Sequence, residues 1–199
     1  MRKSKTHDLI VAAMLSAIAF ILMFFDFPIP MLIPSFVKMD ISDLPALLGA
    51  FSLGPWYGVV ISFVKNLLHI VIKGTSTACA GELGNFLMGA VFAATAGWLY
   101  KRHKNRKGAI LGAVVGAVVM AVFSVPSNYF ITYPAYVTFY NMPLEAILGM
   151  YQAILPAADS LVKCLIIFNM PFTLVKGLLD AVICMMIYKP LSPILHGRK

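Results

Sequence analysis

Long apolar stretches separated by short basic clusters constrain this chain more than any other feature of its sequence. Of its 199 residues, 60% are hydrophobic and only 12% are charged, whereas soluble domains are about 45–50% apolar. Such a chain cannot bury its apolar surface within itself, so lipid must surround much of it. Because the apolar runs have the length of membrane-crossing helices, we expect an all-α integral membrane protein.

The positive charges predict how the chain is oriented in the membrane. Eleven of the 16 Lys and Arg residues lie in three clusters, within residues 2–5, 101–107 and 189–199. Lys and Arg that flank membrane spans are retained on the cytoplasmic side. We therefore expect all three clusters, and with them the N- and C-termini, to be cytoplasmic. The positions of these charges follow membrane topology and do not suggest a basic groove that binds phosphates. We therefore do not expect nucleic-acid binding.

The apolar runs predict six transmembrane helices in a single substrate-binding domain that covers residues 1–199. The run at residues 44–53 is too short for a full span, which needs roughly 17–25 residues. Gly54-Pro55 separates it from the next run. Counting this run as a crossing puts all three basic clusters on one side, whereas five crossings would put the 101–107 cluster opposite the basic N-terminus. The predicted spans are 9–25, 43–53, 55–72, 81–100, 108–130 and 165–187.

The segment between the last two spans is predicted to be external. It runs from Thr132 to about Val162 and is apolar and proline-bearing. A short helix is expected within it, at about residues 144–155.

Charged and amide side chains within the spans are the main functional signal, because a charge at the centre of a membrane helix costs about 2.5–3.5 kcal/mol on insertion scales. Under the six-span topology, Glu82, Asn128 and Lys176 all lie in the outer half of the membrane. Their convergence predicts an outward-facing pocket. A carboxylate, an amide and an ammonium, surrounded by aromatic and methionine side chains, suit a flat small molecule with polar edges.

These polar residues also have structural interpretations, which the sequence leaves open. Lys176 and Asp180 are four residues apart on one helix face, which favours an intrahelical ion pair. Glu82 opens its helix, where a carboxylate stabilises the positive end of the helix dipole. Lys65 and His69 share a helix face, which predicts hydrogen bonds inside the bundle rather than a metal site.

Two sets of small residues predict close helix packing. Ala13 and Ala17 form a small-xxx-small pattern on the first span, which lets another helix approach closely. This pattern is typical both of a docking surface for a partner helix and of packing inside the bundle. Gly108, Gly112 and Gly116 form a similar stripe on the fifth span, which we expect to face the bundle interior.

Several catalytic motifs are missing from the sequence. It contains no G-x-x-x-x-G-K-[ST] phosphate loop, so the chain cannot energise transport with an ATPase of its own. Neither H-E-x-x-H nor G-x-S-x-G is present, which argues against a membrane protease or hydrolase. We therefore expect no catalytic residues, no cofactor and no metal, and a binding subunit that obtains energy from partner chains.

Four segments resemble the RibU-type, riboflavin-specific S components of energy-coupling factor (ECF) vitamin transporters. The resemblance covers almost the whole chain. The Asp-x-Ser-Asp-x-Pro-Ala pattern within the first segment is shared by several kinds of S component, whereas the segments around Glu82 and Lys176 point to riboflavin. The four segments are Phe36–Leu48, Gly54–Gly58, Gly81–Phe86 and Pro171–Gly177.

The resemblance implies a six-helix subunit of the bacterial plasma membrane that binds riboflavin tightly on the external side. It implies that the first helix, with Ala13 and Ala17, docks onto a transmembrane coupling subunit that carries two cytoplasmic ATPases. Thr173 stands where the resemblance leads us to expect a polar, possibly acidic, residue, and at this position the chain departs from the family pattern. The implied substrate-binding residues are Glu82, Asn128, Lys176, Thr173 and Asn85, with Met39 and Asp40 from a lid loop at residues 36–40.

Other functions remain open at this stage. The chain could be an S component for another vitamin, such as pantothenate or a thiamin precursor, or one that also accepts flavin mononucleotide. It could also be an intramembrane enzyme that uses Glu82 and His69 as acid and base, or a permease that works without partners. The colour of the purified protein would separate a flavin-binding protein from the others.

Overall fold

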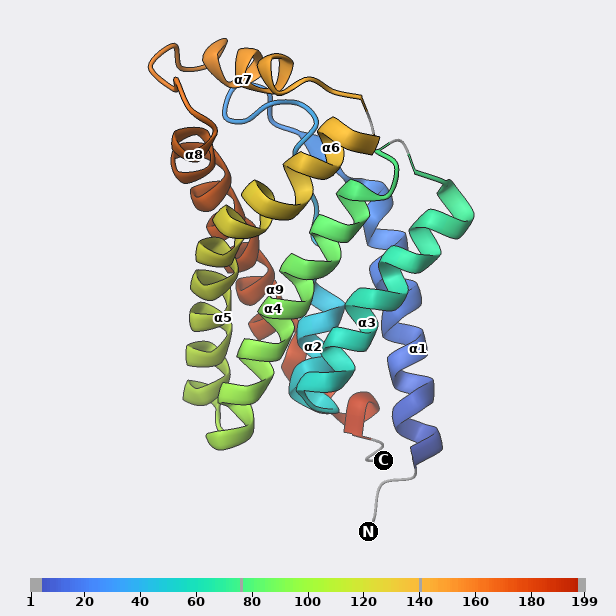
Figure 1. Ribbon diagram of the computed structural model, residues 1–199. Coiled ribbons are helices and arrows are strands. Elements are labelled where there is room, and N and C mark those ends of the chain that lie inside the picture. Colours follow the sequence, from blue (N-terminus) through green and yellow to red (C-terminus); the bar gives the residue numbers. More distant parts are fainter. Residues whose placement is uncertain (1–4, 76, 140, 197–199) are drawn as a thin grey trace.

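Helices that run side by side make up most of the computed structural model, with one two-stranded hairpin near an end (Figure 1). The structure describes residues 5–75, 77–139 and 141–196, with side chains to residue 191. Four basic residues of the terminal clusters therefore lie outside the described residues: Arg2, Lys3, Arg198 and Lys199. The elements are α1 (Lys5–Leu22), η1 (Met23–Phe25), β1 (Phe27–Pro28), β2 (Lys38–Met39), α2 (Leu44–Ser52), α3 (Pro55–Leu68), η2 (His69–Lys73), α4 (Ala80–Arg102), α5 (Arg106–Ser127), η3 (Asn128–Thr132), α6 (Tyr133–Phe139), α7 (Leu144–Gln152), α8 (Leu161–Cys164), η4 (Leu165–Asn169) and α9 (Met170–His196).

Within the described residues, five helical segments are long and apolar enough to cross a membrane. Each contains or overlaps one of the longer predicted spans, so the prediction of a helical membrane protein is confirmed. The beginning of α1, the turn between α4 and α5 and the end of α9 lie at one end of the bundle, at the bottom of Figure 1. The segments are Lys5–Phe25, Pro55–Lys73, Ala80–Arg102, Arg106–Phe139 and Leu161–Leu191.

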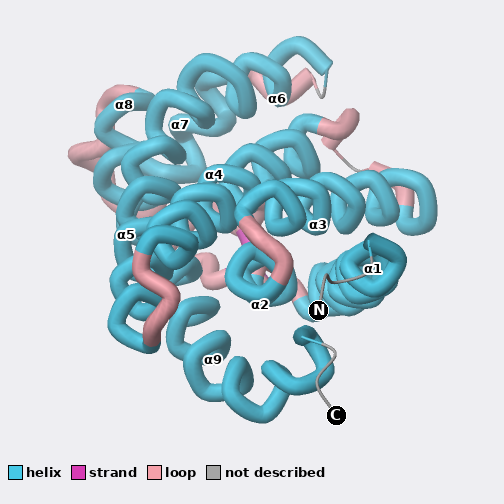
Figure 2. The backbone as a smooth tube through the Cα atoms, turned by 90° about the horizontal axis from the view of Figure 1, so that it is seen from below, coloured by secondary structure: helices cyan, strands magenta, loops and turns pink. Residues whose placement is uncertain are grey.

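The short helix α2 lies in the middle of the bundle rather than at its surface. All nine of its residues are buried, and the view along the helices shows it enclosed by α1, α3, α4 and α9 (Figure 2). Gly54 ends this segment with a φ of 122°, which favours glycine, and Pro55 then starts α3, where a missing backbone N–H costs nothing. The sequence correctly predicts a separate short helix here.

The fifth predicted span is longer than expected. We predicted a helix over 108–130 and an external loop from Thr132, but the helix continues through η3 and α6 to Phe139, so that the loop boundary is wrong. Tyr133 and Tyr136 are both buried, and packing of their side chains favours helix where the sequence only suggests a loop. Pro126 within α5 removes one backbone donor, and a wider π-helical turn follows, as is common where a helix ladder is disturbed.

The last predicted span, 165–187, is likewise extended at both ends. The helix begins at α8, passes through the π-helical turn η4 and continues in α9 to His196. The short helix predicted within 144–155 is confirmed as α7.

Small residues let α4 and α5 pack closely, as the glycine stripe predicts. Gly108, Gly112 and Gly116 are all buried on α5. A Cβ atom on Gly112 would lie 2.7 Å from the carbonyl oxygen of Ala96 on α4, which is closer than side-chain carbons approach. The prediction that this stripe faces the bundle interior is confirmed.

Two separate hydrophobic cores stabilise the fold. The larger one fills the bundle around α2, with members from α1, α3, α4, α5 and α9. The smaller one joins α6, α7, α8 and η4 to the loop between β1 and β2, and includes Ile33, Tyr133 and Tyr151. Because the two cores are distinct, the elements above the bundle form a cap with packing of its own.

The close approach at Gly58 yields a stability prediction. A Cβ atom there would lie 2.8 Å from each of the Ala46 carbonyl oxygen, Ala50 Cβ and Ala93 Cβ, so Gly58→Ala should destabilise the fold by about 1–3 kcal/mol, as overpacking does. Thermal unfolding of the detergent-solubilised protein measures the change. Gly149→Ala is the matched control, since an added Cβ there meets nothing within 4 Å. Equal unfolding temperatures for the two variants would contradict this packing.

Candidate functional site

A cavity of about 520 Å³ lies at the end of the bundle opposite the turn between α4 and α5. The first loop, the η2–α4 segment, η3 and the start of α9 supply its walls. Six of the seven substrate-binding residues predicted from the sequence line it: Asp40, Glu82, Asn85, Asn128, Thr173 and Lys176. Met39 is not among the lining residues; its side chain is buried, and its backbone pairs with that of Phe27.

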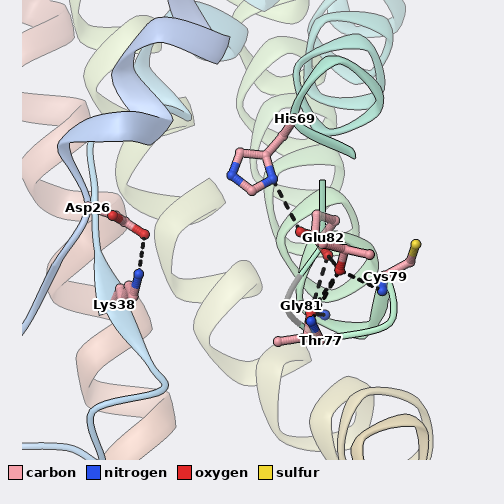
Figure 3. Close-up of polar contacts among 8 residues, drawn as sticks. Asp26, Lys38, His69, Thr77, Cys79, Gly81 and Glu82 are labelled. Carbon is pink, nitrogen blue, oxygen red and sulfur yellow. Dashed lines mark hydrogen bonds and ion pairs between the residues drawn. The ribbon is translucent and has the colours of Figure 1, made fainter. Parts of the chain in front are cut away.

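Glu82 is held in the cavity wall by three side chains. Its Oε1 lies 3.2 Å from Nδ1 of His69, and its Oε2 accepts hydrogen bonds from the hydroxyls of Thr75 at 3.0 Å and Thr77 at 3.3 Å. Figure 3 shows His69, Thr77 and Glu82 pointing toward one another. A carboxylate can only accept hydrogen bonds, so Nδ1 of His69 is the donor. The predicted hydrogen bonding of His69 inside the bundle is confirmed.

The turn before α4 places the two threonines. Thr75 Oγ1 accepts the backbone N–H of Cys79 at 2.8 Å, and Thr77 Oγ1 accepts that of Gly81 at 3.0 Å. Cys79 takes a left-handed conformation, with φ of 67°, which turns the chain sharply into the helix. These hydroxyls therefore satisfy backbone donors at the helix start, and Glu82 remains directed at the cavity.

Lys176 forms its ion pairs with the first loop. Its Nζ lies 2.9 Å from Oδ2 of Asp40 and 3.3 Å from Oδ2 of Asp43. The predicted intrahelical pair with Asp180 is wrong: both carboxylate oxygens of Asp180 are buried without a hydrogen-bond partner among the described residues. Helix spacing identifies neighbours on the same helix only, whereas the loop before α2 brings two carboxylates directly to Lys176.

Asp43 connects this pair to a second buried lysine. Its Oδ1 accepts a hydrogen bond from Nζ of Lys65 at 2.5 Å, and the same ammonium donates to the hydroxyl of Ser42 at 2.8 Å. The side chains of Lys65 and Asp43 are 0% and 1% exposed. Asp43 occupies the N-cap position of α2, but its side chain makes no capping hydrogen bond and pairs with the lysines instead.

The electrostatic environment keeps Asp40 ionised. Burial raises the pKa of its carboxyl group, but the ammonium groups of Lys176 and Lys65 outweigh burial and hold the pKa well below its usual range. The backbone N–H of Ser42 also donates to Asp40 Oδ1 at 2.8 Å. A negatively charged loop residue is therefore paired with a cationic helix residue at the cavity wall at neutral pH.

Two further polar atoms in the cavity wall have no partner within the described part of the chain. These are Oδ1 of Asn85 and the hydroxyl oxygen of Thr132, both buried. Buried polar groups are nearly always hydrogen-bonded in native proteins. Both atoms can therefore accept hydrogen bonds from a solute in the cavity.

A network of two tyrosines and an amide links the cap to the cavity, and the sequence did not reveal it. The hydroxyls of Tyr133 and Tyr151 are 2.5 Å apart, Tyr151 donates to Oδ1 of Asn169 at 2.6 Å, and Nδ2 of Asn169 donates to the Tyr133 hydroxyl at 3.2 Å. Burial raises the pKa of Tyr151, so its hydroxyl stays a donor. The only sequence signal was the irregular helix at Asn169 and Pro171, because irregular backbone at membrane depth usually lines a cavity.

The chemistry of the cavity suits one class of ligand. Aromatic and methionine side chains cover much of its wall, and polar groups of both signs project between them. Its volume is that of a small-molecule site. Within the described residues, no group of three or more His, Cys, Asp or Glu residues is arranged to hold a metal ion. Lining residues that sequence reasoning did not include are, among others, Met23, Asp43, Thr75, Thr77, Met88, Met120, Tyr133, Tyr136, Asn169 and Phe172.

Comparison with known proteins gives consistent matches over nearly the whole chain. Residues 7–188 match the family described as the substrate-specific component of ECF transporters. The chain is 31% identical to the riboflavin transporter FmnP of Bacillus subtilis, covering 95% of this chain and 94% of that protein. It is 34% identical to the riboflavin transporter RibU of Staphylococcus aureus, and the match covers 92% of this chain and 89% of that protein. A solved structure of the S component of a bacterial ECF transporter superposes with a TM-score of 0.74 at 33% identity, covering 96% of this chain and 99% of that one.

The tyrosine network yields a second stability prediction. Tyr151→Phe removes the donor to Asn169 and leaves a buried amide oxygen unpaired, so the protein should lose about 1–3 kcal/mol of stability. Tyr129→Phe deletes the same hydroxyl group from a residue that is 40% exposed and should change stability little. Thermal unfolding of both variants tests this. A Tyr151→Phe protein as stable as Tyr129→Phe would show that the network contributes nothing to the cap.

Proposed function

Because the chain belongs to the family of substrate-specific (S) components of ECF transporters, we propose that it is the high-affinity riboflavin-binding subunit of an ATP-driven vitamin uptake transporter. The observation that carries the proposal is the meeting of Glu82, Asn128 and Lys176 in one cavity. The two riboflavin transporters described above, which match over most of their length, support riboflavin as the substrate.

The ligand chemistry fits the polar groups of the cavity. Isoalloxazine presents carbonyl and ring-nitrogen acceptors with one imide N–H, and the ribityl tail presents several hydroxyls. Lys176 and Asn128 donate to the acceptors, and Glu82 accepts from an N–H or O–H group. Asn85 and Thr173 add contacts to the same ligand, and residues 36–40, with Met39 and Asp40, form a lid over it.

In the membrane, we propose six crossings with both termini in the cytoplasm and the cavity facing outward. The sixth crossing is the buried helix α2 together with the loop that precedes it, since nine residues rise only about 14 Å. This arrangement puts the basic turn between α4 and α5 on the cytoplasmic side, as the distribution of Lys and Arg requires. The membrane is the plasma membrane of a bacterium.

Energy comes from partner chains in this proposal. The transmembrane coupling subunit of an ECF module docks onto α1, and its two ATPase subunits hydrolyse ATP. Ala13 and Ala17 lie on the exposed face of α1, whereas Ala12 and Ser16 are buried in the bundle. A face with small side chains at this spacing admits a second helix at close range. The transporter family gives no support to a catalytic role for Glu82 and His69, although these residues are in contact.

A spectroscopic experiment tests the ligand assignment. Protein purified in detergent should carry flavin, visible by its absorption in the blue, and should quench the fluorescence of added riboflavin. Lys176→Ala should weaken riboflavin binding at least tenfold, which is about 1.4 kcal/mol, because the variant loses an ammonium donor to the ligand. Competition with flavin mononucleotide in the same assay shows whether the phosphorylated form is also accepted.

Two further variants separate loss of a contact from loss of folding. Lys163→Ala removes an exposed lysine that pairs with Asp159 at 2.7 Å outside the cavity, and it should bind riboflavin normally. Asn128→Ala removes a donor without disturbing the ion pairs of Lys176, and it should also bind more weakly. The assignment is refuted if folded Lys176→Ala and Asn128→Ala proteins both keep the original affinity.

The docking face on α1 gives a prediction about transport rather than binding. The double substitution Ala13→Leu and Ala17→Leu should leave riboflavin affinity unchanged but reduce uptake to near background in cells that contain the whole transporter, because the larger side chains hold the partner helix away. Ile18→Leu, at an exposed position of the same helix that is already large, is the control. Normal uptake by the double variant would rule out docking through this face.

A further inference from the structure

The turn between α4 and α5 carries a dense group of exposed cations. Lys101, Arg102, Lys104, Arg106 and Lys107, which we call the basic turn, fall within seven consecutive residues, and all of them are exposed. This turn lies at the opposite end of the bundle from the cavity (Figure 1). The proposed transport function does not use these residues.

No described residue neutralises the basic turn. None of its five cations forms an ion pair with another residue in the described ranges. The sequence also contains no Asp or Glu between Glu82 and Glu145, so neither α4 nor α5 brings an acidic group to this end. Neither of the two helices that form the turn therefore supplies a counter-charge, and the cations are open to an anion from outside the chain.

The helix dipoles make an external anion more favourable at this turn. Lys101 and Arg102 lie in the last turn of α4, where cations are stabilised by the negative end of the dipole. Arg106 and Lys107 lie in the first turn of α5, which contains no acidic residue, and cations are disfavoured there. An anionic group at the start of α5 would relieve this repulsion and bind to free backbone N–H groups.

The turn is also held in a defined conformation. Asn105 caps α5 by accepting the backbone N–H of Gly108 at 2.7 Å. A Cβ atom on Gly108 would collide with the carbonyl oxygen of His103, so the chain folds back tightly on itself at this point. The cations are therefore presented by a fixed turn rather than by a long flexible loop.

Trp98 indicates that the basic turn lies at the membrane surface. Trp98 is 64% exposed, and the guanidinium of Arg102 lies over its ring with 5.5 Å between Cζ and the ring centroid. Exposed Trp beside Arg or Lys at the end of an apolar span is typical of the membrane–water interface. Lipid headgroups are the anions found at that depth.

We propose that the basic turn binds the phosphate headgroups of anionic phospholipids. Lys and Arg clustered directly beside a membrane helix attract acidic lipids in this way. A headgroup phosphate beside Arg106 and Lys107 would provide the missing charge at the start of α5. An acidic protein surface is the rival partner, but the interfacial Trp98 and the emergence of the turn directly from two apolar helices favour lipid.

Tryptophan fluorescence can test this proposal with the full chain in lipid nanodiscs. The chain has two tryptophans, so Trp56→Phe leaves Trp98 as the reporter beside the basic turn. Two kinds of phosphatidylcholine nanodisc are prepared, each with a minor fraction of brominated lipid. The brominated lipid is phosphatidylglycerol in one and phosphatidylcholine in the other, with bromine near the headgroup end of the acyl chains in both. We expect brominated phosphatidylglycerol to quench Trp98 fluorescence at least twofold more strongly than brominated phosphatidylcholine does. High salt should reduce this difference, because salt screens exposed charges.

Charge-matched variants decide whether the basic turn causes the preference. The triple substitution Lys104→Gln, Arg106→Gln and Lys107→Gln should abolish it, while Arg102 and its stacking on Trp98 remain. The triple exchange Lys104→Arg, Arg106→Lys and Lys107→Arg keeps every charge and should keep the preference. Both proteins should bind riboflavin normally, so this test can fail without affecting the proposed function. Equal quenching by the two brominated lipids, or a preference that survives in the Gln variant, would overturn the proposal, and equal quenching would point to an acidic protein partner.

Discussion

Two lysines on different helices share one buried aspartate, and the arrangement of the bundle around the cavity depends on this contact. Asp43 receives Lys65 from α3 on one carboxylate oxygen and Lys176 from α9 on the other. Breaking a buried ion pair by removing one partner typically costs about 3–5 kcal/mol, because an uncompensated charge remains. In a chain surrounded by lipid, the pairing therefore fixes α2, α3 and α9 relative to one another and forms the polar floor of the cavity.

The same contact leaves Lys176 able to hold a ligand. An ammonium group has three N–H donors; one is donated to Asp40, and Asp43 Oδ2 lies 3.3 Å away as an ion-pair partner only. In the proposed function, a remaining N–H donor serves a carbonyl or ring nitrogen of the ligand without breaking either ion pair. The pairing thus keeps the cation desolvated and oriented before the ligand arrives, which lowers the cost of ordering the site on binding.

Hydropathy and charge distribution predicted the long helices and three polar residues of the cavity, because lipid accepts apolar side chains and disfavours polar ones. Glu82, Asn128 and Lys176 could be identified one by one from the cost of placing polar groups in a span, and they do line one cavity. The partner of Lys176 could not be predicted, since Asp40 is 136 residues away and only the fold brings it near. Tyr133 and Tyr151 were also missed, because nothing in the spacing of residues along the sequence distinguishes a buried tyrosine pair from ordinary apolar packing.

The proposed lid loop is held more weakly at its outer part than at its base. Lys38 and Asp26 form an exposed ion pair at 2.8 Å (Figure 3), and exposed pairs contribute about 0–1 kcal/mol. At the base, Asp40 is buried and ionised against Lys176, so separating that pair takes a buried carboxylate away from its hydrogen-bonded ammonium partner. Phe36 packs its ring edge-on against Tyr133, Tyr136 and Tyr151, which ties the middle of the loop to the cap rather than to the bundle. If the loop acts as the proposed lid, opening it on the Lys38 side breaks an exposed ion pair and preserves the buried charge pairing that positions Lys176.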